Sequence, residues 1–335
     1  MQNTEPEVSL PHKLVHVAVG VIYREDSILI AKRSDNAHQG GLWEFPGGKV
    51  ESNESVQEAL ARELKEELGI TLAHPQTGLS PLIQIRHDYG DKRVLLDVWS
   101  VFEFSGDPTG LEGQPVKWVR ESNLREFEFP AANEPIIRAI ELPSIYPVTP
   151  VFSSLDNAYA YISALIEKEI DLILFRQPQL SSNAYLSWLH ALQIDFPQMR
   201  FVLSGDPCLL LPHAKIGLQI PARYAEDFLD RVTSSNTIVS PPLLSMSCHS
   251  LAELELAQRI GVDFVCLSPV KPTQSHPNAN AMGWERFQSL LKSINVPVYA
   301  LGGMQPRDKA IAQSAGAQGI AGISAWYDQN EHVEK

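Results

Sequence analysis

Residues 48–70 read GKVESNESVQEALARELKEELGI, and this stretch decides the fold of the chain around it. Apolar residues recur here at every fourth position, so on a helix they form one row that faces a core. The row consists of Val56, Leu60, Leu64 and Leu68. Ser55 and Glu58 have the spacing of a capping box, and Gly69 is a typical C-terminal stop. The pattern predicts a helix over residues 55–68.

Three acids converge on one edge of this helix. Glu67 lies at the edge of the apolar row, Glu63 one turn before it, and Glu66 on the far side of Glu63. Like charges at these spacings cost an exposed helix about a few tenths of a kcal/mol, and more as burial lowers the dielectric. A hard dication such as Mg²⁺ offsets that repulsion. The alternative is a solvated acidic face, which the opposite side of the helix already provides with Glu54, Glu58 and Lys65.

The same residues complete the signature GX5EX7REUXEEXGU, where U is aliphatic, and the chain resembles the Nudix hydrolases at every position of it. The resemblance implies that Glu63, Glu66 and Glu67 bind Mg²⁺ or Mn²⁺, joined by the main-chain oxygen of Gly47. It also implies that Arg62 anchors the helix by pairing with an acid, such as Glu66 at the i, i+4 spacing. An exposed ion pair worth under about 1 kcal/mol is the alternative.

Composition limits the partners and the compartment. A length of 335 residues favours two domains, and 27 Lys and Arg against 40 Asp and Glu give a net charge of −13, which repels long nucleic acid. A bound cation still permits a small anionic substrate. The cysteines Cys208, Cys248 and Cys266 lack CxxC spacing. Residues 1–13 do not resemble a signal peptide, and no apolar run reaches bilayer length, so we expect a cytoplasmic protein without a membrane partner.

The chain around the signature reads as an α/β sandwich with a mixed sheet. Strand patterns cover residues 14–23, 27–32, 82–86, 94–104 and 116–120, and the first two are joined as a hairpin. A second helix is predicted over residues 134–141. We therefore expect a first domain over residues 14–141.

Three stretches in this domain resemble the 8-oxo-dGTP diphosphatases among the Nudix hydrolases. They are LWEFPGGK at 42–49, LEGQP at 111–115 and PAANEP at 130–135, within a resemblance that spans residues 15–140. The resemblance implies a purine nucleoside triphosphate such as oxidised dGTP as substrate. It further implies attack of a metal-activated water on the β-phosphorus, with release of nucleoside monophosphate and pyrophosphate. Lys92, where the family has Arg, departs from the pattern.

The resemblance also assigns the base-binding residues. Asn133 would read the purine edge, because an amide offers both a donor and an acceptor. The alternative is a helix N-cap before Glu134. Phe45 and Tyr89 would stack on the base, although core packing explains an aromatic at either place equally well. The remaining substrate-binding positions are Glu44, Pro46 and Gly47.

Other residues match positions near the phosphates. Arg33 and His38 match substrate contacts, and Arg33 suits a phosphate or ribose oxygen unless it is a solvated strand-end cation. Lys49 would neutralise charge on the departing phosphate. Glu112 matches a further metal or base position, although a loop glutamate often has no role. Either Glu63 or Glu112 takes the proton of the attacking water, and the sequence leaves both open.

Beyond Leu142-Pro143-Ser144 the pattern changes to alternating strands and helices. Eight candidate strands, at residues 145–147, 172–176, 200–203, 216–219, 244–247, 264–267, 298–301 and 319–322, predict a compact (β/α)8 TIM barrel. We place this second domain at residues 145–328.

The second half resembles the thiamine phosphate synthase and TenI family in YPVT at 146–149, SMSCHS at 245–250, DFVCLSPVKPT at 263–273 and ALGGM at 300–304. The resemblance implies a phosphorylated ligand held by backbone N–H groups. The residues are Gly302, Gly303, Gly322 and Ser324, for which a turn role is the alternative. Pro178 and His276 stand in place of synthase lysines, and no acid follows Gln219, which argues against full synthase activity.

Three hypotheses follow. The leading one is a two-domain hydrolase that removes oxidised purine nucleotides from the nucleotide pool and so protects DNA replication. The second is a thiamine-pathway transferase whose Nudix half acts on thiamine diphosphate or an analogue. In the third, the barrel is a ligand-binding module without catalysis.

Overall fold

The computed structural model describes residues 14–35, 39–74, 78–90, 92–206, 216–234, 241–273, 280–323 and 326. Four residues discussed above, His38, Cys208, His276 and Ser324, lie outside this set. The chain divides into two compact units, Met1–Glu134 and Pro135–Lys335. A search of the described residues found no helix with the length and apolarity needed to cross a membrane.

The first unit is built on a mixed sheet around β1 (Leu14–Arg24). This strand pairs in parallel with β7 (Arg93–Val101) and antiparallel with β2 (Ser27–Lys32) and β4 (Gly47–Lys49). The other strands of the sheet are β3 (Trp43–Glu44), β6 (Leu79–Asp88) and β9 (Val116–Arg120). The predicted mixed sheet and its hairpin of β1 and β2 are confirmed.

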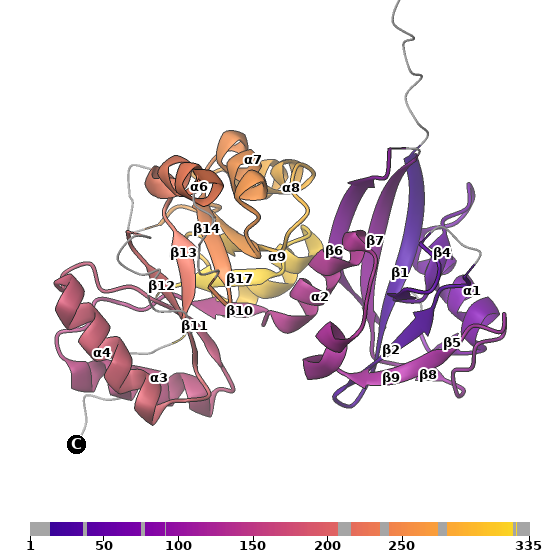
Figure 1. Cartoon of the computed structure of the whole chain (residues 1–335), viewed down its shortest axis with the longest axis horizontal. Helices are drawn as coiled ribbons and strands as arrows, with labels where there is room; N and C mark the ends of the chain where they lie inside the picture. Colours follow the sequence, from indigo (N-terminus) through magenta and orange to yellow (C-terminus); the bar gives the residue numbers. More distant parts are fainter. Residues whose placement is uncertain are drawn as a thin grey trace, which may run out of the picture. The chain divides into compact units, whose positions relative to one another are not determined.

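Helix α1 (Val56–Leu68) packs against this sheet, beside β1 and β4 (Figure 1). The predicted capping box is present, since Ser55 N–H donates to Glu58 at 2.8 Å and Glu58 N–H donates to the Ser55 hydroxyl at 3.2 Å. Gly69 ends the helix in the left-handed region at φ 73°. Leu64 of the apolar row is fully buried, and Gly20 of β1 lets the helix approach closely. The helix axis and ends are thus fixed by local sequence.

The structure departs from prediction in the short elements. Two-residue and three-residue strands β3 and β4 were not predicted, because so few residues show no alternation. The strand expected to reach residue 104 ends at Val101, and β8 (Phe104–Ser105) pairs instead with β5 (Thr71–Leu72) in a separate two-stranded sheet. Two 3-10 turns follow β9, namely η1 (Glu121–Glu126) and η2 (Ala131–Asn133).

The second unit is a parallel eight-stranded barrel, as predicted. Its strands are β10 (Ile145–Pro147), β11 (Leu172–Phe175), β12 (Arg200–Ser204), β13 (Gly217–Ile220), β14 (Leu244–Cys248), β15 (Phe264–Leu267), β16 (Val298–Leu301) and β17 (Gly319–Gly322). The first and second of these meet through a parallel bridge between Val148 and Leu174, which closes the circle. The short α2 (Glu134–Glu141) precedes β10.

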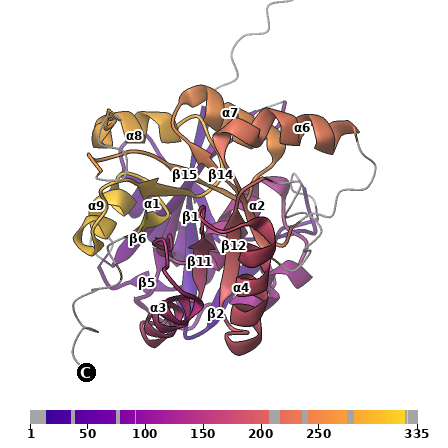
Figure 2. The same ribbon diagram turned by 90° about the vertical axis from the view of Figure 1, so that its left-hand side faces the viewer.

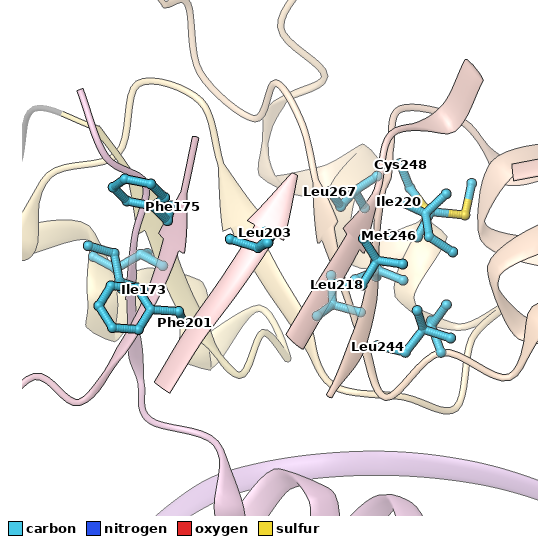
Figure 3. Packing of buried hydrophobic residues seen from close by; sticks show 14 of the residues in the cluster. Ile173, Phe175, Phe201, Leu203, Leu218, Ile220, Leu244, Met246, Cys248 and Leu267 are labelled. Carbon is cyan, nitrogen blue, oxygen red and sulfur yellow. The ribbon is translucent and has the colours of Figure 1, made fainter. Parts of the chain in front are cut away.

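Helices surround the barrel strands (Figure 2). They are α3 (Leu155–Glu167), α4 (Ser182–Asp195), α6 (Ala225–Ser234), α7 (Leu251–Ile260), α8 (Gly283–Leu291) and α9 (Lys309–Ser314), with the turns η3 (Ala222–Tyr224) and η4 (Pro306–Asp308). Because strand side chains alternate, each strand contributes to two cores. On β11, Ile173 and Phe175 join the cluster beneath the helices, part of which Figure 3 shows, whereas Leu172 and Leu174 fill the interior.

Candidate active site

Two consecutive glycines place β4 against the carboxylate helix. Gly47 has φ 145°, and a Cβ added there would lie 2.1 Å from the carbonyl oxygen of Ala18. At Gly48, an added Cβ would lie 2.2 Å from the carboxyl carbon of Glu63. The first glycine of the signature therefore lets β4 approach Glu63 closely, because the flexible carboxylate side chain occupies the space where a Cβ would stand.

Glu67 lies in the middle of the acidic group. Its carboxylate is half-buried and accepts a hydrogen bond from Gly47 N–H at 3.2 Å. Burial raises the pKa of Glu67 to about 7; the Gly47 hydrogen bond opposes this rise, and the charges of Glu63, Glu44 and Glu112 add to it. The charges of three acids thus raise the pKa of a fourth, Glu67, although Glu44, Glu63 and Glu112 are far apart in the sequence.

Arg62 holds the acids in position, as its spacing predicted. It donates to Glu66 at 3.2 Å, to Glu63 at 2.9 Å, and to Glu54 at 2.7 and 3.1 Å. It also donates to the main-chain oxygen of Lys49 at 3.0 Å, which ties the helix to β4. The expectation that Glu54 lies on the solvated helix face is wrong, since Glu54 precedes the helix and its side chain is only 16% exposed beside Arg62.

The donor set fits a hard divalent cation. Within the described ranges no three acidic, histidine or cysteine side chains already have metal-site spacing. The guanidinium of Arg62 draws Glu63 and Glu66 toward itself and supplies the positive charge there. Glu67, by contrast, has a backbone N–H as its hydrogen-bond partner. Carboxylate oxygens, with the carbonyl of Gly47 nearby, are the ligands that Mg²⁺ and Mn²⁺ prefer.

The loop that carries Glu112 is fastened to the end of α1. Leu111 N–H donates to the Glu67 carbonyl at 2.9 Å, and the Gln114 amide donates to the same oxygen at 3.1 Å. Gln114 in turn accepts from Glu112 N–H at 2.9 Å. Sequence reasoning missed Gln114, because its role depends on a carbonyl that is distant along the chain.

Arg33, which directly follows β2, forms an ion pair with Glu44 of the adjoining strand β3. Burial raises the pKa of Glu44, and the charge and hydrogen bond of Arg33 oppose the rise. Arg33 is therefore a partly buried, paired cation, and the solvated-cation alternative does not hold. Tyr89 is close enough to both residues for their charges to act on its pKa, which burial raises. Glu44 therefore acts electrostatically both on Glu67 and on Tyr89, one of the residues expected to stack on the base.

The base-binding candidates follow β3. Phe45 is 3% exposed and stacks on Phe129 with ring centroids 5.3 Å apart. Buried Pro46 accepts from Gly20 N–H at 2.8 Å, a backbone role. Trp43 N–H donates to the Glu128 carbonyl, so the segment that leads to Asn133 runs beside β3.

Asn133 is buried at 8% exposure, at the end of η2. Its N–H donates to the Pro130 carbonyl at 2.8 Å. No residue in the described part of the chain hydrogen-bonds to its side-chain amide, and in particular that amide caps no helix N–H. The N-cap alternative is therefore not supported, and the amide, whose nitrogen and oxygen are not fully buried, is available to hydrogen-bond water or a ligand group.

The remaining candidates are less constrained. Lys49 is exposed on β4. In the barrel, Gly302 and Gly303 have φ of 95° and 65°, and their added Cβ atoms would meet Pro269 at 2.8 Å and the Pro272 carbonyl at 2.4 Å. Close approach of two loops therefore already explains both glycines. Gly322 is buried at the end of β17, where its carbonyl accepts from Val148 N–H at 2.8 Å.

Comparison with known proteins matches each unit to a family. The NUDIX domain model matches residues 18–139, and the thiamine monophosphate synthase model matches residues 145–326. The 8-oxo-dGTP diphosphatase of Escherichia coli (strain K12) is 38% identical over 130 residues, which are 38% of this chain and 98% of that protein. The chain belongs to the Nudix hydrolases and, through its second unit, to the thiamine monophosphate synthases.

Two further relatives show how far these resemblances extend. The CTP pyrophosphohydrolase of Escherichia coli (strain K12) is 34% identical over 127 residues, 38% of this chain and 92% of that protein. The putative thiamine-phosphate synthase 2 of Aquifex aeolicus (strain VF5) is 27% identical over 192 residues, 56% of this chain and 100% of that protein. The Nudix hydrolase unit therefore has relatives whose names specify different bases.

Proposed function

We propose that the Nudix unit is a divalent-metal-dependent nucleoside triphosphate pyrophosphohydrolase that converts 8-oxo-dGTP to 8-oxo-dGMP and pyrophosphate. The observation that carries the proposal is the charge on Glu67, which faces three other acids and a single backbone N–H donor. A dication bound by these acids would supply the missing positive charge. The free thiols of Cys248 and Cys266 fit a reducing compartment, so we place the protein in the cytoplasm.

Mg²⁺ or Mn²⁺ would be held by Glu63, Glu66, Glu67 and the Gly47 carbonyl, and the bound ion would lower the pKa of water and neutralise phosphate charge. Glu112 and Glu63 are the candidates to take the proton from the attacking water. We favour Glu112, because Arg62 engages Glu63, whereas the bonds from Leu111 and Gln114 to the Glu67 carbonyl hold the backbone of the Glu112 loop at the end of α1. Lys49 stabilises the negative charge on the leaving phosphate.

The purine is the second part of the proposal, and Asn133 supports it. Asn133 is 8% exposed and its amide has no hydrogen bond to a described residue, so its donor and its acceptor can both pair with a base edge that carries the complementary groups. Oxidation of guanine at C8 adds a carbonyl oxygen there and a hydrogen on N7, which turns one acceptor of the base into a donor. The ring of Tyr89 has the Lys92 amine 5.4 Å from its centroid and lies close enough to Arg33 for that charge to act on its pKa, whereas Phe45 stacks on Phe129 and forms a wall.

A substrate panel tests this function. Pyrophosphate release is measured for 8-oxo-dGTP, dGTP and CTP, orthophosphate release for thiamine diphosphate, and phosphate release after phosphatase treatment for ADP-ribose. We expect the highest kcat/KM for 8-oxo-dGTP. Preference for CTP would contradict the proposed substrate and favour the activity named for the CTP pyrophosphohydrolase of Escherichia coli. Preference for thiamine diphosphate would favour the thiamine-pathway hypothesis instead.

For the barrel we propose a binding site for a phosphorylated ligand at the carboxyl ends of β16 and β17, near Gly302, Gly303 and Gly322. The family match supports this, and the exposed Arg176 at the end of β11 adds a cation at the same end of the parallel strands. Pro178 removes the neighbouring synthase cation, so binding without transfer is expected. Thiamine monophosphate and inorganic phosphate should each raise the unfolding temperature, and transferase turnover at synthase rates would overturn the non-catalytic assignment.

A further inference from the structure

An exposed loop between β8 and β9 carries Glu112, the residue that we favour as proton acceptor. Within residues 111–115, Gln114 is partly buried and the other four residues are exposed. An exposed loop residue ordinarily samples many conformations, because ordering it costs conformational entropy. A proton acceptor, in contrast, has to lie within hydrogen-bond reach of the attacking water. The function of Glu112 therefore requires contacts that hold its loop in one place.

Both ends of the Gln114 side chain are engaged in such contacts. Its amide nitrogen donates to the main-chain oxygen of Glu67 at 3.1 Å, and its amide oxygen accepts from Glu112 N–H at 2.9 Å. One side chain thus joins the backbone of a proposed metal ligand to the backbone of the proposed proton acceptor. The carboxylate of Glu67 takes no part in this link, because its partner is Gly47 N–H at 3.2 Å.

Two backbone donors of the same loop also bind the end of α1. Thr109 N–H donates to the Leu68 carbonyl at 3.1 Å, and Leu111 N–H donates to the Glu67 carbonyl at 2.9 Å. Carbonyls in the last turn of a helix have no partner within the helix, so the loop caps α1. Leu111 and Gln114 lie on either side of Glu112 and share one acceptor, which closes Glu112 and the following glycine into a short turn.

The loop is also packed against itself. Gly113 N–H donates to the Gly110 carbonyl at 3.1 Å, and a Cβ added at Gly110 would lie 3.0 Å from the amide oxygen of Gln114. The Gln114 side chain therefore lies against the opposite arm of the loop, where glycine leaves room for it. The charge of Glu112 adds to the rise in the pKa of Glu67, so its carboxylate lies within electrostatic range of the acidic group.

We propose that Gln114 is a positioning residue of the hydrolase, which sets the place of Glu112 relative to the metal-binding helix. The inference rests on the proposed role of Glu112 as proton acceptor. Gln114 acts on the reaction only through Glu112, and it binds the main chain of Glu67 while leaving the carboxylate to the metal. Loss of its amide should therefore slow the chemical step and leave metal binding unchanged.

The first test is Gln114→Met in the full chain, which keeps the side-chain length and removes both hydrogen bonds. We expect kcat for 8-oxo-dGTP to fall about 10–100-fold, because a misplaced proton acceptor loses most of its effect. KM and the Mg²⁺ concentration for half-maximal activity should each change less than about twofold, as expected when only the transition state loses an interaction. A rise in either value as large as the fall in kcat would overturn the inference.

A shorter amide and a matched control complete the comparison. Gln114→Asn keeps the amide group but lacks one methylene, so it cannot span both partners and should also lower kcat. Gln84→Met makes the first substitution elsewhere in the same unit, where it removes an amide bond to Asp97 at 2.8 Å, and should keep kcat within about twofold of wild type. Wild-type kcat in the Gln114 variants, or an equal loss in the control, would overturn the inference. If Gln114→Met does not fold, Gln114→Asn decides alone.

Combination with Glu112→Gln separates this inference from the proposed function. In that background Gln114→Met should lower kcat no further, as expected for two changes that act through one group. A further loss as large as in the wild type would show that Gln114 acts independently of Glu112, and would overturn the inference. If Glu112→Gln alone keeps wild-type kcat, the proposed proton acceptor fails. If Glu112→Gln lowers kcat but the Gln114 variants do not, only the positioning inference fails.

Discussion

In the Nudix unit the acids around Glu67 repel one another, whereas polar side chains inside the barrel hydrogen-bond to one another. Around Glu67, burial raises the pKa of the carboxyl group to about 7, and the charges of Glu63, Glu44 and Glu112 add to this rise. In the barrel, Gln219 is 2% exposed and its amide is satisfied internally: it donates to Ser247 at 2.9 Å and accepts from Ser245 at 3.3 Å and Tyr146 at 3.4 Å.

The same contrast holds at the end of β11. There the amide of Gln177 donates to the Pro150 carbonyl at 2.7 Å and accepts from Phe152 N–H at 2.9 Å, in the loop where the synthases carry a lysine. Polar groups that satisfy each other stabilise a fold and leave little capacity for developing charge. Uncompensated charge, by contrast, costs stability and is retained where a ligand relieves it. The difference favours the Nudix unit as the place of catalysis.

The largest effect should come from Glu67→Gln, which removes the charge and keeps the side-chain size. We expect kcat for 8-oxo-dGTP to fall about 10²–10³-fold, because a charged group that stabilises the reaction centre is lost. In the absence of metal the variant should unfold at a slightly higher temperature than wild type, since repulsion from Glu63 is relieved.

Thermal unfolding with and without Mg²⁺ checks the assignment independently of activity. Mg²⁺ should raise the unfolding temperature of the wild type much more than that of Glu67→Gln. Glu58→Gln on the same helix is the control, because glutamine also completes a capping box. Near wild-type turnover of Glu67→Gln at saturating Mg²⁺ would remove Glu67 from the metal site.

The next effect should come from Gly48→Ala. The new Cβ would stand 2.2 Å from the Glu63 carboxyl carbon, so this flexible side chain must move away, while the backbone of β4 tolerates alanine. We expect the Mg²⁺ concentration for half-maximal activity to rise about 10–100-fold, because the orientation of a metal ligand is lost. The circular dichroism spectrum should stay unchanged. Wild-type metal dependence would mean that Glu63 binds no metal.

The sequence predicts what depends on periodic patterns and misses what depends on single contacts. The row of Val56, Leu60, Leu64 and Leu68 and the eight barrel strands were predictable because burial imposes a period on many residues. The close approach of Gly48 to Glu63 was not, because it joins a short strand to a helix through one missing Cβ. The division of the chain at Glu134 could not be predicted either, because Gln318 and Asp263, which contact α2, lie more than 100 residues away along the chain.

A smaller effect, on selectivity, should come from Asn133→Ala. Loss of the amide should cost about 1–3 kcal/mol of preference for 8-oxo-dGTP over dGTP, with kcat for the better substrate little changed. The ratio of kcat/KM for the two nucleotides measures it. An unchanged ratio would leave the buried amide without a role in base recognition.

We expect the smallest effect from a change in the barrel, the loss of the ion pair between Lys271 and Asp308. It should lower the stability slightly and leave the hydrolase activity unchanged. Asp308 is nearly buried beside Lys271 at 2.7 Å; burial alone would raise its pKa, but hydrogen bonds from Lys271 and Gln305 hold that pKa below its ordinary value. The folded chain therefore keeps this carboxylate charged at a pH where the unfolded chain has taken up a proton. The stabilisation is full above the ordinary pKa of aspartate and is lost as the pH falls through the lowered value.

Lys271→Met isolates this contribution. Because the lysine is about one-third exposed, solvent screens the pair, and the variant should lose no more than about 1 kcal/mol of unfolding free energy at neutral pH. Denaturant unfolding of both proteins from pH 7 down to pH 3 should show their difference shrinking as Asp308 is protonated. Hydrolysis of 8-oxo-dGTP should be the same in both at pH 7. A lowered rate there would show that a polar pair at the carboxyl ends of the barrel strands also affects hydrolysis, and the contrast between a charged catalytic unit and a barrel whose interior polar groups satisfy one another would no longer hold.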